Sequence, residues 1–189
     1  FGNIYSRIGN PTVGALEARL TALEDGAMCV ALSSGTSAIM YSLINIMSQG
    51  DNFISANQLY GGTYTMFDNI LPEYGINAKK VDITNLEAVE ESIDDKTRAI
   101  FCETITNPGL VVADISALSD IAHSKGIPLI VDATFTTSAI QKSFDYGADI
   151  VVYSLTKWMS GHGRVIAGAV IEKGGFEWGN GNFPLFDKP

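Results

Sequence analysis

The strongest limit on the fold of this chain comes from two short apolar runs, each followed by polar residues. Residues 148–152 (Ala-Asp-Ile-Val-Val) and 127–131 (Ile-Pro-Leu-Ile-Val) show no regular alternation of apolar and polar side chains. Such runs are typical of strands buried on both faces, as in a parallel sheet covered by helices. Open sheets of this kind bind ligands just beyond the carboxyl ends of their strands. We therefore expect a binding site where these two runs end.

The rest of the sequence alternates between short apolar segments and segments with helical spacing. This alternation predicts an α/β fold with a mostly parallel sheet flanked by helices, and we find no internal domain boundary. Further strands are expected at residues 28–32, 52–56, 77–81, 98–103 and 165–171, and helices at residues 13–23, 37–47, 64–71, 86–93 and 115–124.

Composition excludes several classes of partner. The net charge of −9 argues against nucleic-acid or polybasic membrane binding, and no apolar stretch is long enough to span a bilayer. The only histidines, His123 and His162, have no metal-ligand spacing with the acids, so no metal site is expected. Cys29 and Cys102 lie in apolar runs, which favours buried thiols in a reduced cytoplasmic protein. A disulfide between them is the alternative. Because Phe1 is not preceded by methionine, we expect a piece of a longer chain.

Lys157 and Asp132 are the candidate reactive residues that follow the two runs. Most lysines are solvated, but Lys157 comes after Ser154 and Thr156 at a strand end, where a solvated surface lysine is not usually found. A lysine that is partly desolvated near other cations is less basic and forms imines with aldehydes. Asp132 either caps the next turn or pairs with a protonated ring nitrogen and keeps that ring electron-poor. The pair suggests a site for a cationic ring that forms an imine.

The segment Ser33-Ser34-Gly35-Thr36-Ser37-Ala38 is a candidate phosphate site. Glycine lets the backbone approach a ligand, and the free amides at a helix start bind anions. The segment can equally be only a helix cap. A nucleotide-binding module that uses it as a phosphate cradle is a further alternative, although the sequence lacks the glycine-rich dinucleotide turn and a Walker loop.

Tyr60 and Asn107 are two further candidates. Tyr60, before Gly61 and Gly62, is either a core aromatic or a platform that stacks on a ring and moves protons with its hydroxyl. Asn107, fixed by Pro108, is either a turn residue or a donor to a ring oxygen. The recurrence of candidates after successive strands favours one shared site.

Six short blocks, in order along nearly the whole chain, resemble one family. The blocks are residues 5–12 (YSRIGNPT), 34–36 (SGT), 59–63 (LYGGT), 106–108 (TNP), 131–135 (VDATF) and 154–157 (SLTK). In these blocks the chain resembles the large domain of the fold type I pyridoxal-phosphate enzymes of cysteine and methionine metabolism. The resemblance covers about half of a family member, because the C-terminal domain with its substrate-anchoring arginine has no counterpart here.

The resemblance implies a role for each matching residue. Lys157 would form the imine with pyridoxal phosphate and later shuttle protons between substrate carbons. Asp132 would pair with the pyridine nitrogen, and Tyr60 would stack on the ring and assist proton transfer. Asn107 would contact the ring hydroxyl, and Thr134 would belong to the same cofactor site.

The phosphate and the subunit arrangement are also implied by the resemblance. The implied phosphate ligands are the amides of Gly35 and Thr36 and the hydroxyls of Ser154 and Thr156. Tyr5 and Arg7 would reach the phosphate in the neighbouring subunit, so residues 1–12 form an arm and residues 13–189 the cofactor-binding domain. A homodimer or homotetramer is therefore expected.

The choice of reaction depends on the last part of the sequence. Residues 172–178 (EKGGFEW) and 182–184 (NFP) resemble an extension seen in O-acetylhomoserine sulfhydrylases, whereas the plain alternative is a polar loop with incidental aromatics. The resemblance thus implies γ-replacement on a small amino-acid substrate, O-acetylhomoserine, with sulfide or a thiol. The alternatives are γ-elimination, cystathionine synthesis or cleavage, and a cofactor-binding fragment without activity of its own.

Overall fold

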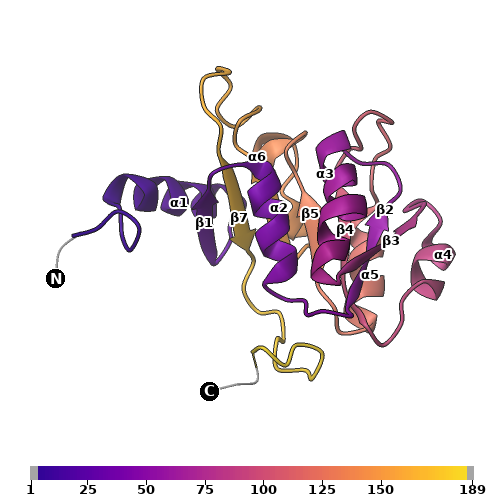
Figure 1. The fold of residues 1–189 in the computed structure, drawn as a ribbon. Coiled ribbons are helices and arrows are strands. Elements are labelled where there is room, and N and C mark those ends of the chain that lie inside the picture. Colours follow the sequence, from indigo (N-terminus) through magenta and orange to yellow (C-terminus); the bar gives the residue numbers. More distant parts are fainter. Residues whose placement is uncertain (1–3, 187–189) are drawn as a thin grey trace.

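The computed structural model describes residues 4–186, in which seven strands form one sheet with the order β1-β7-β6-β5-β4-β2-β3 (Figure 1). The neighbours from β6 through β5, β4 and β2 to β3 are parallel, whereas β7 runs antiparallel to both β6 and β1. The predicted α/β fold with a mostly parallel sheet is confirmed. The strands are β1 (Met28–Leu32), β2 (Asn52–Ala56), β3 (Asn77–Val81), β4 (Thr97–Glu103), β5 (Leu129–Asp132), β6 (Ile150–Ser154) and β7 (Gly168–Glu172).

Helices cover the sheet and extend beyond it. Along the strand order, the connection from β1 to β2 runs toward the β3 edge, whereas the connections from β4 to β5 and from β5 to β6 run toward the β1 edge. Right-handed crossovers then place α2, which packs on β6 and β7, and α5, which packs on β4 and β5, on opposite faces. Figure 1 shows α1 extending sideways past β1. The helices are α1 (Pro11–Glu24), α2 (Gly35–Ile44), α3 (Gly61–Thr65), α4 (Leu86–Glu91), α5 (Ile115–Ser124) and α6 (Thr137–Ile140).

The buried strands explain the apolar runs. All five residues of β2 are buried, as are six of the seven in β4. Phe67 joins the two strands, because its ring meets Phe53 and Phe101 edge-on at centroid distances of 4.8 and 5.2 Å. Cys29 and Cys102 are both buried and free, which removes the disulfide alternative.

The segment after Gly61 differs from the predicted helix over residues 64–71. The α-helix starts earlier, at Gly61, and ends at Thr65; a π-turn (Met66–Ile70) and a 3-10 turn (Leu71–Tyr74) follow. Pro72 accounts for the tight final turn, because proline has no N–H to donate and clashes with the preceding helical turn.

Two other boundaries move for local reasons. The predicted helix over residues 37–47 starts at Gly35, because Ser34 caps it by accepting a hydrogen bond from the Ser37 amide at 3.0 Å. The last strand starts at Gly168 rather than residue 165, since the Ala167 amide donates to the Thr156 hydroxyl at 3.1 Å. The short helix α6 was not predicted.

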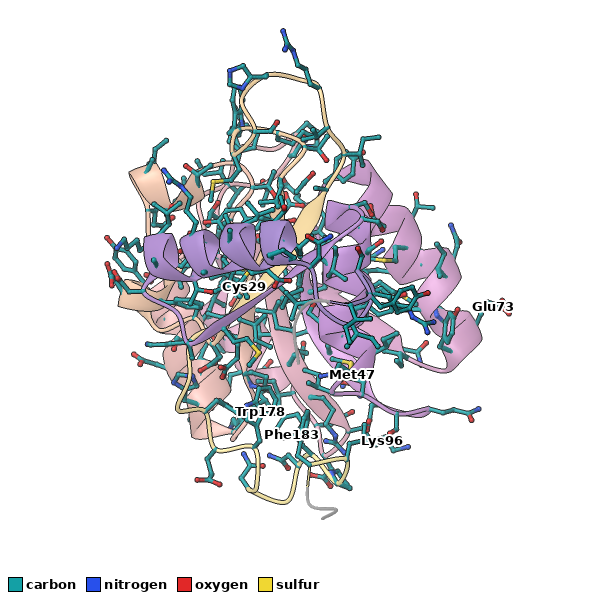
Figure 2. All side chains as sticks on the ribbon, turned by 90° about the vertical axis from the view of Figure 1, so that its left-hand side faces the viewer. Cys29, Met47, Glu73, Lys96, Trp178 and Phe183 are labelled. Carbon is teal, nitrogen blue, oxygen red and sulfur yellow. The ribbon has the colours of Figure 1, made fainter. Side chains whose placement is uncertain are left out.

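The glycine-rich tail is irregular, as expected, but its aromatic residues are not incidental. Phe183 is 1% exposed, and its ring lies 5.1 Å from that of Trp178. Figure 2 shows these two labelled side chains next to each other. Phe176 joins them at 4.6 Å from Trp178. Side-chain amides of Asn180 and Asn182 donate to the Gly126 carbonyl at 2.8 and 3.0 Å. The tail is therefore a packed part of the domain, which overturns the plain alternative.

Candidate active site

A cleft of about 720 Å³ opens at the carboxyl ends of β4, β5 and β6. Nine of the residues predicted from the sequence line this one cleft: Gly35, Thr36, Tyr60, Asn107, Asp132, Thr134, Ser154, Thr156 and Lys157. Tyr5 and Arg7 are not among the lining residues. The cleft thus joins segments from four strand ends with the start of α2, as expected for an open parallel sheet.

The start of α2 provides an anion-binding end of the cleft. The amides of Gly35 and Thr36 have no partner within the helix, so they are available to an anion, whereas the Ser37 amide donates to the Ser34 hydroxyl. Gly35 is required for packing, because a Cβ atom there would lie 2.5 Å from the Ser154 Cβ atom. The cap formed by Ser34 and the predicted phosphate site are therefore compatible readings of the same segment.

The hydroxyl residues near β6 do not contribute equally. Thr156 Oγ1 donates to the Ala167 carbonyl at 3.2 Å and accepts from the amide of the same residue, so its proton is already engaged. Thr134 Oγ1 accepts from the Ser154 amide at 2.7 Å, which ties β5 to β6. The Ser154 hydroxyl makes no hydrogen bond within residues 4–186 and is the better placed phosphate donor of the three.

Asp132 ends β5 with its side chain at the cleft. Its Oδ1 atom accepts from the Thr134 amide at 2.9 Å, so it does cap the following turn. Burial raises the pKa of this carboxyl, and hydrogen bonds from Thr134 only partly oppose the shift. No cationic side chain among the described residues pairs with it. A protonated ring nitrogen would supply the missing charge, and Asp132 therefore fits a pyridinium ring.

Lys157 reaches the cleft from the segment between β6 and β7, which rises above the edge of the sheet in Figure 1. Its amide donates to the Ser154 carbonyl at 3.2 Å, which fixes the backbone. The side chain is exposed and forms no ion pair within the described part of the chain. The expectation of a partly desolvated lysine is wrong for this structure, because little of the chain covers that segment.

Tyr60 stands at the side of the cleft. Its side chain is half exposed, so it is not a core aromatic. A Cβ atom at Gly62 would lie 2.6 Å from Tyr60 Cε1, and the glycine therefore makes room for the ring. Asn107 lines the opposite loop, in the turn before Pro108. Both side chains are available to a ligand.

Glu103 is a cleft residue that the sequence interpretation missed. It ends β4 and is 6% exposed, and its carboxylate accepts from the amides of Tyr60 and Asn107 at 2.7 and 3.0 Å. Burial raises its pKa to about 7, against the effect of the hydrogen bond from Tyr60, and the nearby charge of Asp132 adds to the rise. The signal was present, because Glu103 ends an apolar run just as Asp132 does.

Two other kinds of site find no support in residues 4–186. No group of three or more His, Cys, Asp or Glu side chains is arranged there to hold a metal ion. No helix in this range has both the length and the hydrophobicity needed to cross a membrane.

The fold and the cleft define a class of protein, the fold type I pyridoxal-phosphate enzymes. Within that class, the model of the family described as Cys/Met metabolism PLP-dependent enzyme matches residues 1–185. The chain therefore belongs to the pyridoxal-phosphate-dependent enzymes of cysteine and methionine metabolism. This membership overturns the alternative of a nucleotide-binding module.

Individual relatives agree with this assignment. An O-acetyl-L-homoserine sulfhydrylase of Leptospira meyeri is 44% identical over 189 residues, which are 100% of this chain and 43% of that protein. A Campylobacter jejuni crystal structure that contains N'-pyridoxyl-lysine-5'-monophosphate has a TM-score of 0.90 at 41% identity, over 93% of this chain and 44% of that one. The crystal structure of cystathionine γ-lyase from Lactobacillus plantarum, complexed with L-serine, has a TM-score of 0.87 at 40% identity. The match covers 92% of this chain and 45% of that one. The chain thus spans less than half the length of these proteins.

Proposed function

We propose that the cleft binds pyridoxal phosphate, and that the chain is the cofactor-binding half of an enzyme that replaces the acetate of O-acetylhomoserine with sulfide or a thiol. The products would be acetate and homocysteine or methionine. The observation that supports cofactor binding best is that an exposed lysine, a partly buried carboxyl without a cationic partner within residues 4–186 and a helix start line one cleft. The substrate is suggested by the sulfhydrylase relative at 44% identity.

Each residue of the cleft has a task in this proposal. When bound, the cofactor supplies an electron-poor ring that stabilises negative charge on the adjacent substrate carbon. Asp132 keeps the proton on the ring nitrogen, and the amides at the start of α2 hold the phosphate together with Ser154. Lys157 takes a proton from one substrate carbon and returns it to another, a role that its exposed position allows. Tyr60 holds the ring from the side.

The reaction is tested with the full-length protein, because this chain lacks most of its relatives' length. We expect O-acetylhomoserine and sulfide to give acetate and homocysteine, with little turnover of methionine or cystathionine. Ammonia and ketobutyrate released from methionine as the main products would reject γ-replacement. The matched control is the same assay without sulfide.

The likeness to cystathionine γ-lyase keeps γ-elimination, and cystathionine synthesis or cleavage, as the second candidate. The fold cannot separate these reactions, because the two solved relatives are nearly equal in TM-score. The same assay decides between them. A third candidate, a fragment that binds cofactor without turnover, predicts cofactor binding by this chain and no product from it.

The N-terminal arm suggests how subunits combine. Tyr5 and Arg7 are exposed outside the cleft, with the Arg7 guanidinium carbon 5.3 Å from the Tyr5 ring centroid. We propose that they contact the phosphate in the partner's cleft, in a homodimer or a tetramer of dimers. The proposed arm, residues 1–12, overlaps the first turn of α1. Residues 1–3 of the arm and residues 187–189 of the proposed cofactor-binding domain lie outside the described residues.

The arm makes a quantitative prediction. We expect Arg7→Ala to weaken pyridoxal phosphate binding roughly 10- to 100-fold, since it removes charge-assisted hydrogen bonds to the phosphate. Cofactor titration of the full-length protein measures this, and Arg19→Ala, on the exposed side of α1, is the control. An Arg7 variant with unchanged affinity and unchanged oligomeric state would remove the arm from the site.

A further inference from the structure

Glu103 has an arrangement that the proposed chemistry does not use. It stands at the end of β4, is nearly inaccessible, and makes a separate hydrogen bond with each carboxylate oxygen. Oε1 accepts from the Tyr60 amide at 2.7 Å and Oε2 from the Asn107 amide at 3.0 Å. One side chain therefore joins the loop after β2 to the loop after β4.

We propose that Glu103 is a positioning residue whose carboxylate holds these two loops together and so fixes Tyr60 and Asn107 on either side of the bound ring. The inference rests on the proposed binding of pyridoxal phosphate. It adds a residue that touches neither substrate nor phosphate and acts through the two residues that flank the ring.

The two amides need an acceptor that the main chain does not provide. Tyr60 is the N-cap of α3, so its own amide lies outside the hydrogen-bonding pattern of that helix. The Asn107 amide lies within a turn, where no strand runs beside it. An ionised carboxylate accepts at both oxygens, whereas a glutamine would turn an N–H donor toward one of these amides. Glutamate is therefore the side chain that suits both loops at once.

The position of Asp132 connects this arrangement to ligand binding. Glu103 and Asp132 are partners in the parallel register of β4 and β5, so their side chains leave the sheet on the same face. Tyr60 and Lys157 are the other titratable residues lining the cleft. A cation bound to Asp132 would reduce the repulsion between the two carboxyls and favour the ionised form of Glu103. Ligand binding in the cleft should therefore strengthen the hydrogen bonds from both loops to Glu103.

The first experiment measures the loops without any cofactor. Amide hydrogen exchange in residues 57–63 and 104–110 is compared between wild type and Glu103→Gln. We expect exchange at the Tyr60 or Asn107 amide to become about tenfold faster, because one hydrogen bond to a charged acceptor is lost. Glu91→Gln on α4, exposed and not among the residues that line the cleft, is the matched control and should change neither segment.

The second experiment measures pyridoxal phosphate affinity and the visible circular dichroism of the bound ring. Glu103→Gln should weaken binding about tenfold and reduce the dichroism, and Glu103→Asp, which keeps two acceptors, should restore part of both. In a Tyr60→Ala background the effect of Glu103→Gln should shrink markedly, because the residue through which Glu103 acts is gone. If Glu103 contributed only to the stability of the fold, Glu103→Gln would weaken binding by the same factor in the wild-type and Tyr60→Ala backgrounds.

The outcomes separate this inference from the proposed function. Faster loop exchange together with weaker, Tyr60-dependent binding supports it, and Glu103→Asp provides the same comparison if the glutamine variant does not fold. Wild-type affinity in the variants, or full additivity with Tyr60→Ala, overturns the positioning role while leaving cofactor binding intact. If wild type itself binds no pyridoxal phosphate, the proposed function fails and this role fails with it.

Discussion

Replacing Lys157 by alanine is expected to abolish the visible absorbance band that pyridoxal phosphate gives when it is bound to a lysine. The full-length enzyme should lose at least about 10²–10⁴-fold in activity, the usual contribution of a positioned proton-transfer group. The reason is that no other lysine within residues 4–186 lines the cleft. The proposed phosphate contacts at the start of α2 do not involve Lys157, so the variant should still bind the cofactor, although more weakly.

The control for this prediction is Lys96→Ala. Lys96 is exposed, and Figure 2 shows it at the surface. Absorbance spectra of the loaded proteins before and after dialysis measure the band and its retention. A band of wild-type intensity in Lys157→Ala would show that another amine holds the cofactor and would reject the assignment of Lys157.

Asp132→Asn is expected to produce the second large effect. The variant keeps the shape of the side chain and loses the charge, so the ring nitrogen is no longer held protonated. Removal of one such electrostatic partner typically costs about 10²–10³-fold in kcat. Steady-state kinetics of the full-length protein measure this loss, and Asp120→Asn, an exposed change on α5, is the control.

The cofactor-free protein should respond to Asp132→Asn in the opposite direction. Burial raises the pKa of Asp132, so the folded state holds its proton more tightly than the unfolded state does. Stability from this group is present at low pH and is lost as pH rises from about 4 through the folded-state pKa. The asparagine variant lacks this loss, and its midpoint of thermal unfolding near pH 7 should be no lower than that of wild type. A clear drop would mean that the carboxylate is structurally required.

Burial on both faces left a plain apolar run in the sequence for β2, whereas the edge strands β1 and β3 are only partly buried. The ranges 28–32, 52–56 and 77–81 agree with the structure at both ends. The helix over 115–124 does too, because Asp114 caps it by accepting from the Ala117 amide at 3.0 Å. Direction was harder: an apolar run does not say whether a strand is parallel, and the antiparallel course of β7 could not be derived from it.

Most of the residues that line the cleft could be predicted from the sequence, whereas the hydrogen bonds and the exposure of their side chains could not. Residues after strand ends meet at one edge of a parallel sheet, and so Asp132, Asn107 and Ser154 could be brought together from order alone. The engagement of the Thr156 hydroxyl with Ala167 and the exposure of Lys157 depend on how the segment between β6 and β7 folds back. Such long-range choices leave no local pattern.

The pairing of β1 with β7 has a consequence for how the molecule assembles. β1 is the first strand within residues 4–186, yet its only partner in that range is β7, with Met28 opposite Glu172. During synthesis β1 cannot pair until β7 has been made, and contacts this distant in sequence slow folding. Gly168 also lies directly against the Ser34 carbonyl. A nascent chain that ends before β7 would therefore present an open β1 edge and an unsupported start of α2, a form suited to capture by chaperones or proteases.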